Sequence, residues 1–206
     1  MFRGMIRTKL VAALLALAAT AGCGPAEQAA PADQSASLIG GPFTLTDQTG
    51  ARVTEADFLG RPMVVFFGYA SCPDVCPLSL NKLTVAYDML ESEYGADANE
   101  FQTVLITVDP ERDTPEILAG YVENPGFPSN LVGLTGNMEE IQAAADAYRV
   151  YFNKDESGDT AAQYLVDHTS VIYLMADDGS FYNAFTHAST PAEIAAGLRQ
   201  YLDDRG

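Results

Sequence analysis

The sequence predicts an α/β sandwich in which helices cover both faces of a mixed central sheet. Short apolar runs typical of buried strands alternate with longer segments that carry helix-capping residues. The last two apolar runs flank Asp177-Asp178-Gly179, a sequence typical of a tight hairpin turn. Alternating strands and helices that end in an antiparallel hairpin favour a three-layer sandwich. With 206 residues, 48% of them hydrophobic, the chain is long enough for one such domain and a short tail.

The expected strands and helices follow one another in a regular order. Strands are expected at residues 43–47, 51–54, 63–67, 101–108, 131–134, 150–152, 169–175 and 181–185, where the chain is apolar or alternates between apolar and polar residues. Helices are expected at residues 80–94, 115–122, 138–148 and 191–202. Four residues are expected to cap helical turns: Thr54, Thr114, Asn137 and Thr190.

This order of elements is that of a thioredoxin-like fold with an N-terminal β-hairpin and a mid-chain insertion. The hairpin is expected at residues 43–54, where two short strands flank the turn at Gly50. Residues 153–160 are polar and are expected to form a mobile loop.

The first 37 residues are expected to export and tether the domain. Residues 1–22 combine a basic start, a short apolar core and small residues, which is typical of a secretory signal. The residues before Cys23 resemble the lipobox of bacterial lipoproteins, which implies that Cys23 is lipidated. The alternative is an uncleaved membrane anchor, but the apolar run is shorter than the ~20 residues that span a bilayer. Residues 23–37 predict a flexible tether, so we expect a folded domain at 38–206, held at a membrane in the bacterial periplasm.

The net charge limits the kinds of partner that the protein is expected to bind. The chain carries a formal charge of −17 at pH 7, and a surface this acidic repels phosphate backbones. Nucleic acid is therefore not expected as a partner. The acidity fits a basic protein partner, or it serves only to keep the protein soluble.

Two cysteines, Cys72 and Cys76, lie on the expected turn between the strand at 63–67 and the helix at 80–94. In a turn with helical curvature, residues four apart lie on one side, so both sulfurs can approach one point. A helix N-terminus also lowers thiol pKa values, which favours nucleophilic attack and metal binding. Three interpretations stay open: a structural disulfide, a redox-active dithiol and a metal site.

The chain has two histidines that could complete a metal site. His168 immediately precedes an expected strand whose edge lies beside the cysteine loop in a sheet of this order. His187 follows the last strand and is expected to be a solvated loop residue. Two thiolates and one imidazole suit Cu(I) and can also hold Cu(II), whereas zinc usually takes a fourth ligand. Copper is therefore the expected metal.

Three segments together resemble the Sco/SenC family of copper-binding proteins that help to assemble cytochrome c oxidase. They are residues 71–77 (SCPDVCP), 108–115 (VDPERDTP) and 166–170 (VDHTS). The resemblance covers about residues 38–203. It implies a thioredoxin-like fold, a copper site of Cys72, Cys76 and His168, and a role at the dinuclear copper site of oxidase subunit II. It does not settle whether the Asp109 segment shapes a loop, contacts a partner or only ends a strand.

Two functions follow from these residues. The first is an extracytoplasmic copper chaperone, not an enzyme, that receives copper from a donor protein and needs His168. The second is a thiol-disulfide oxidoreductase that reduces the cysteines of a partner metalloprotein and needs only Cys72 and Cys76. Thioredoxins resemble one another in having a proline where this chain has His168-Thr169, which favours the chaperone. A copper or redox sensor is a third hypothesis.

Overall fold

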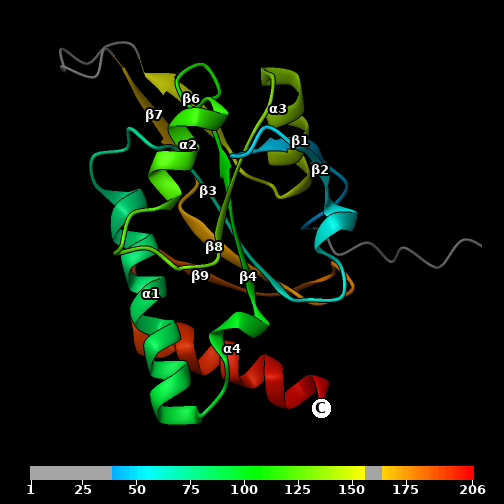
Figure 1. Cartoon of the computed structure of the whole chain (residues 1–206), viewed down its shortest axis with the longest axis vertical. Helices are drawn as coiled ribbons and strands as arrows, with labels where there is room; N and C mark the ends of the chain where they lie inside the picture. The colour runs from blue at the N-terminus through cyan, green and yellow to red at the C-terminus, as the bar shows by residue number, and fades with distance from the viewer. Residues whose placement is uncertain (1–38, 156–163) are drawn as a thin grey trace, which may run out of the picture. The chain divides into compact units, whose positions relative to one another are not determined.

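Strand β3, Met63–Gly68, lies inside a seven-stranded mixed sheet whose order is β2-β1-β5-β4-β3-β8-β9 (Figure 1). All six of its residues are buried, as the apolar run predicts. It pairs in parallel with β4 on one side and antiparallel with β8 on the other. The expected mixed sheet and thioredoxin-like order of elements are therefore confirmed.

The structure is a computed structural model that describes residues 39–155 and 164–206. The strands are β1 Thr44–Asp47, β2 Arg52–Thr54, β3 Met63–Gly68, β4 Gln102–Thr107, β5 Leu131–Thr135, β6 Phe152–Asp155, β7 Leu165–His168, β8 Val171–Met175 and β9 Phe181–Thr186. The helices are α1 Val75–Tyr94, α2 Pro115–Val122, α3 Met138–Ala147 and α4 Pro191–Arg205, with short 3-10 turns η1 Glu55–Phe58 and η2 Ala98–Glu100. The expected signal, lipidation site and tether at residues 1–37 lie outside the described residues.

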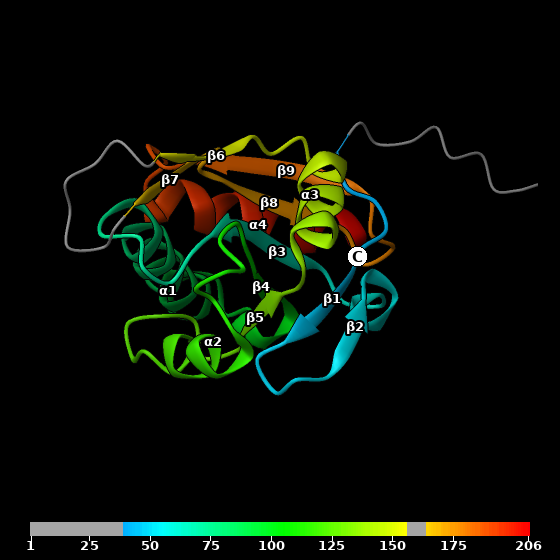
Figure 2. The same ribbon diagram turned by 90° about the horizontal axis from the view of Figure 1, so that it is seen from above.

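Helices cover both faces of the seven-stranded sheet (Figure 2). On one face, α1 packs against α4, and the Tyr87 hydroxyl of α1 lies 2.9 Å from Oγ1 of Thr103 in β4. On the other face, the ring of Phe67 in β3 contacts Tyr148, directly after α3, at 5.4 Å between ring centroids. Successive residues of β3 thus contribute to two apolar layers, as a strand buried on both faces requires.

The expected caps are present. Thr54, Asn137 and Thr190 each form a capping box with the acidic residue three positions later. Thr114 accepts a hydrogen bond from the amide of Ile117, and Pro115 occupies the first turn of α2.

Among the described residues, no helix is both long enough and apolar enough to span a membrane.

Three expectations about the elements are wrong. Helix α1 begins at Val75, not near residue 80, because a proline in the first helical turn removes only an amide that has no partner there. Residues 153–155, expected in a loop, belong to β6, while 156–163 are not described. His168, expected just before a strand over 169–175, instead ends a separate strand, β7, and β8 begins at Val171.

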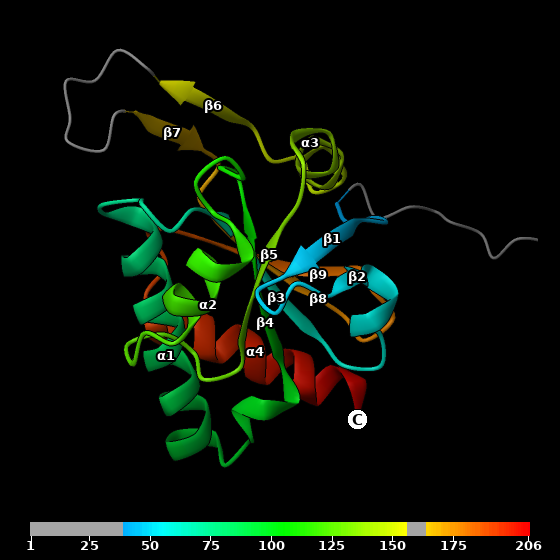
Figure 3. The same cartoon turned by 45° about the horizontal axis from the view of Figure 1, so that its top comes forward.

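Strands β6 and β7 form a second, two-stranded sheet. Figure 3 shows this hairpin beyond the end of the seven-stranded sheet, on the side where α1 begins. It lies between α3 and β8 in the chain. This hairpin is therefore the segment that brings His168 to the cysteine loop.

Candidate metal centre

The two cysteines lie on either side of the start of α1. Cys72 is in the loop after β3, where its amide donates to the carbonyl oxygen of Tyr69 at 3.2 Å. Cys76 is in the first turn of α1, since the helix begins at Val75 after Asp74 as its N-cap. Cys76 is fully buried, whereas 8% of Cys72 is exposed. Both thiols are free. Of the two residues, Cys72 is therefore the one with surface that a ligand or partner can reach from solvent.

Gly68, the last residue of β3, leaves room for the Cys76 sulfur. A Cβ atom at this position would lie 2.9 Å from Sγ of Cys76 and 2.8 Å from the ring of Phe66. Both distances are shorter than side-chain contacts permit. Glycine is therefore needed here because the thiol packs directly against the backbone of β3.

His168 reaches the cysteines from β7. Its Nε2 lies 3.4 Å from Sγ of Cys76. The imidazole packs edge-on against the rings of Phe66 and Tyr69, at centroid distances of 6.1 and 5.9 Å. On its other side, Nδ1 lies 3.3 Å from the carbonyl oxygen of Thr169. A proton on Nδ1 that is donated to this carbonyl leaves the Nε2 lone pair facing the sulfurs.

The ligand atoms of Cys72, Cys76 and His168 all lie within 4.8 Å of one another. Over residues 39–155 and 164–206, this is the one group of three or more cysteine, histidine or acidic side chains placed to hold a metal ion. The structure thus brings together the three residues that the sequence singles out. His187 is exposed, and its carbonyl oxygen accepts a hydrogen bond from Lys82 at 2.6 Å, as expected for a loop residue outside the site.

The pKa values of the two thiols are shifted in opposite directions. The pKa of Cys72 is lowered, mainly by a hydrogen bond from the Cys76 thiol. Burial opposes this shift, whereas a contact with His168 and backbone donors add to it. The same hydrogen bond and burial raise the pKa of Cys76. Loss of a proton is therefore easier at Cys72 than at Cys76.

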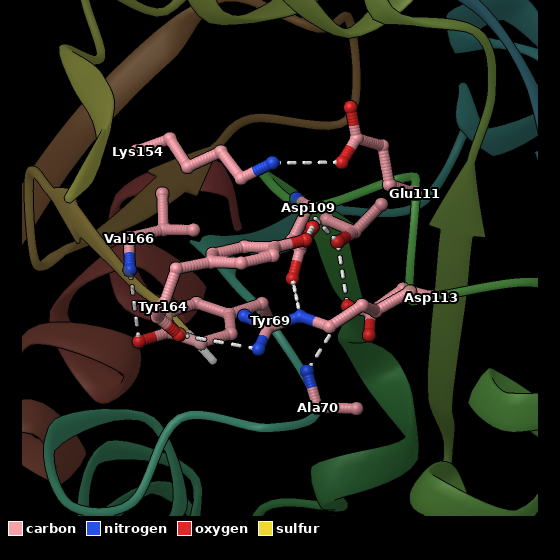
Figure 4. Close-up of polar contacts among 10 residues, drawn as sticks. Tyr69, Ala70, Asp109, Glu111, Asp113, Lys154, Tyr164 and Val166 are labelled. Atoms are coloured by element: carbon pink, nitrogen blue, oxygen red, sulfur yellow. Dashed lines mark hydrogen bonds and ion pairs between the residues drawn. The ribbon is translucent and has the colours of Figure 1, made fainter. Parts of the chain in front are cut away.

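The Asp109 segment forms a buried polar network beside this site (Figure 4). Asp113 accepts hydrogen bonds from the amide of Ala70 at 3.0 Å and from the hydroxyl of Thr107 at 2.6 Å. Asp109 is 3% exposed and forms an ion pair with Arg112. The segment therefore connects the end of β4 to the start of the cysteine loop, which is one of the roles that the sequence left open.

Two residues of this network carry no recognisable sequence signal. Tyr69 accepts a hydrogen bond from the amide of Val166 in β7, at 3.2 Å. Tyr164 donates from its hydroxyl to Asp109 at 2.7 Å. Both contacts join segments more than fifty residues apart in the chain. Local patterns therefore cannot reveal them.

The chain matches the SCO1/SenC family profile over residues 31–203. It is 42% identical over 168 residues to the mitochondrial SCO1 homolog of Homo sapiens, a match that covers 80% of this chain and 53% of the human protein. It is 40% identical over 169 residues to SenC of Rhodobacter capsulatus, covering 82% of this chain and 73% of SenC. The chain thus spans about half the length of the human relative.

Solved structures with the same fold include two that contain copper. Arabidopsis thaliana ScoI with copper bound has a TM-score of 0.74 and 39% identity, and the match covers 81% of this chain and 99% of ScoI. Yeast Sco1 with copper bound has a TM-score of 0.71 and 35% identity, with 80% and 88% of the two chains covered. Together with the profile match, these similarities show that the chain belongs to the SCO1/SenC family.

Proposed function

We propose that this protein is a copper chaperone that binds one copper ion through Cys72, Cys76 and His168 and assists assembly of the dinuclear copper site of cytochrome c oxidase subunit II. The observation that carries the proposal is the convergence of two sulfurs and one imidazole nitrogen within 4.8 Å. Copper is the cargo of this function, received from a donor protein and passed on to the oxidase.

The donor set fits copper better than zinc. Thiolates and imidazole are soft to intermediate ligands that suit Cu(I), and they can also hold Cu(II). Structural zinc sites usually have four protein ligands, but among the described residues no further cysteine, histidine or carboxylate joins this group. The relatives support the choice, because Arabidopsis ScoI and yeast Sco1 have been solved with copper bound.

The proposed location follows from the start of the chain. A secretory signal at residues 1–22 and lipidation of Cys23 would anchor the domain in the periplasm, with residues 23–37 as the tether.

A second candidate function is reduction of a partner's disulfide by Cys72 and Cys76. The unequal acidities of the two thiols favour it. A thiolate at Cys72 can attack a partner's disulfide, which forms a mixed disulfide and releases one partner sulfur as a thiolate. Cys76 gives up its proton, which the released partner thiolate can accept, and the Cys76 thiolate then attacks the Cys72 sulfur of the mixed disulfide. The second partner thiolate leaves, and Cys72 and Cys76 are oxidised to a disulfide. This function does not require a metal-binding nitrogen at His168, so the two candidates differ in their need for that residue.

The test is a titration of the reduced protein with Cu(I) against a competing chromophoric chelator. The wild type should bind one copper, and His168→Ala should weaken binding by about 100-fold or more, since even indirect support of a ligand contributes 10–100-fold. His187→Ala is the matched control and should bind like the wild type. Equal binding by wild type and His168→Ala would reject the three-ligand site and favour the dithiol function.

A further inference from the structure

His168 belongs to a small two-stranded sheet that needs contacts with the rest of the domain to stay in place. Strands β6 and β7 pair through four residues each, from Phe152 opposite His168 to Asp155 opposite Leu165. They pair with no strand of the seven-stranded sheet. An isolated two-stranded hairpin is at best marginally stable in water. Contacts outside the hairpin must therefore hold β7 against the domain.

Tyr164, directly before β7, makes several such contacts. Its hydroxyl donates to Oδ1 of Asp109 at 2.7 Å, and the guanidinium of Arg112 lies 3.8 Å from the centre of its ring. Arg112 also donates to the carbonyl oxygen of Tyr164 at 3.2 Å and to the other oxygen of Asp109. We call these three residues, Asp109, Arg112 and Tyr164, the Tyr164 clamp.

The clamp is anchored in the loop after β4. The amide of Asp109 donates to Oγ1 of Thr107 at 2.9 Å, and the hydroxyl of Thr107 donates to the buried carboxylate of Asp113. Asp113 in turn accepts from the amide of Ala70, two residues before Cys72. One loop therefore contacts both the backbone that leads to the cysteines and the residue that precedes the histidine strand.

A second contact lies between the clamp and the ligands. The amide of Val166 in β7 donates to the hydroxyl of Tyr69, whose ring packs edge-on against His168. The guanidinium of Arg112 lies 5.6 Å from the centre of the Tyr69 ring. Lys154 of β6 adds a cation on the Tyr164 ring at 4.0 Å and an ion pair with Glu111 at 3.0 Å (Figure 4). Both strands of the hairpin are thus joined to the loop after β4.

We infer that the Tyr164 clamp positions His168 for metal binding by fixing β7 against the loop that also holds the start of the cysteine loop. Asp109, Arg112 and Tyr164 are positioning residues, because each acts through β7. The seven-stranded sheet resumes at Val171 and holds the chain after His168, while the clamp holds the chain before it. The inference rests on the proposed copper function.

The variant that tests the inference is Tyr164→Phe, which keeps the ring on Arg112 and removes the hydrogen bond to Asp109. Copper affinity should fall about tenfold, as for other residues that orient a ligand without binding the metal. The matched control is Tyr182→Phe, since Tyr182 also donates to an aspartate, Asp204, but joins β9 to α4 away from the site. Its copper affinity should equal that of the wild type.

A double-mutant cycle separates positioning from general stability. In a His168→Ala background, Tyr164→Phe should reduce copper affinity no further, because the clamp has no histidine to position. A second tenfold loss in that background would show that Tyr164 supports the whole domain, and would overturn the inference. If the Tyr164→Phe single variant binds copper as tightly as the wild type does, the inference is also overturned.

Amide hydrogen exchange of the metal-free protein gives a readout that does not depend on copper. In Tyr164→Phe the amides of β7 should exchange faster by about tenfold, while those of β3 keep their wild-type rates. If Tyr164→Phe folds poorly, Arg112→Lys takes its place as the test variant. It keeps the charge beside Asp109 but loses the planar group on the Tyr164 ring, and its β7 amides should also exchange faster while those of β3 do not. If the wild type binds no copper, the proposed function fails, and unchanged exchange of β7 would then overturn the positioning role as well.

Discussion

Nε2 of His168 lies 3.4 Å from Sγ of Cys76, although 92 residues separate them in the chain. The sheet explains the contact. Strands β3 and β8 are antiparallel neighbours, with Phe66 opposite Ile172, so the end of β3 lies beside the start of β8. Cys76 follows β3 and His168 precedes β8, and both therefore reach the same edge of the sheet.

Cys72 should react as a thiolate well below the pH at which an ordinary thiol does. Its pKa is lowered, mainly by the Cys76 thiol, whereas a free cysteine titrates near pH 8.5. Alkylation of the reduced, metal-free protein by iodoacetamide should therefore keep a nearly constant rate from about pH 8 to about pH 6. A rate that falls about tenfold per pH unit over this range would contradict the lowered pKa. In Cys76→Ala the main cause is removed, and the rate should fall with pH.

Copper binding should release about one proton from the thiol pair. Cys72 is already a thiolate near neutral pH, whereas burial and the neighbouring thiolate raise the pKa of Cys76, so its proton is lost only when the metal binds. The apparent affinity should accordingly weaken about tenfold for each unit that the pH falls. Calorimetry in two buffers with different ionisation enthalpies measures the proton count. Release of two protons would show that both thiols are protonated before binding.

Gly68→Ala should weaken copper binding without contacting the metal. The added methyl group would lie 2.9 Å from Sγ of Cys76 and must displace the sulfur or the Phe66 ring. Overpacking of this kind typically costs about 1–3 kcal/mol, so the free energy of unfolding should fall by a similar amount. Gly120→Ala in α2 is the control, since apart from the chain neighbours and the nearby helix backbone no heavy atom of the described residues lies within 4 Å of its added Cβ. That variant should retain wild-type copper affinity and stability or gain up to about 1 kcal/mol.

Asp113→Ala should destabilise the domain by about 2–4 kcal/mol. The fully buried carboxylate accepts hydrogen bonds from the Ala70 amide and the Thr107 hydroxyl, and both donors would lose this partner in the variant. Urea denaturation followed by circular dichroism measures the loss. Asp178→Ala, which removes an exposed aspartate that accepts from the Ser180 amide, should cost less than about 1 kcal/mol. Equal losses in the two variants would show that burial of Asp113 adds nothing.

The sequence predicts most elements of this fold because their signals are local. Capping residues such as Asn137 and Thr190 mark helix starts, and runs of apolar and β-branched residues mark β3 and β4. The elements it misses lack such signals. β6 is a mostly polar strand, and it forms because β7 lies opposite to it, which is a non-local cause. The start of α1 is expected near residue 80, whereas the helix begins at Val75 and its first turn accepts Pro77.

The sequence predicts the three ligand residues of the candidate site but not the residues that hold them in position. A CxxxC turn and a histidine before a late strand suffice to bring Cys72, Cys76 and His168 together once the order of strands is known. The contact between Tyr164 and Asp109 follows no spacing rule, because it depends on how the hairpin folds back over the loop after β4. Residues that bind can thus be read from the chain, while residues that orient them require the three-dimensional structure.

The separation of the β6–β7 hairpin from the seven-stranded sheet has an evolutionary consequence. The sulfur ligands belong to the junction of β3 and α1, inside the core of the scaffold, whereas the nitrogen ligand belongs to an appendage. Sequence changes in the appendage can therefore replace or remove the nitrogen ligand while every core strand keeps its pairing. Selection can in this way change which metals the protein binds without a matching loss of fold stability.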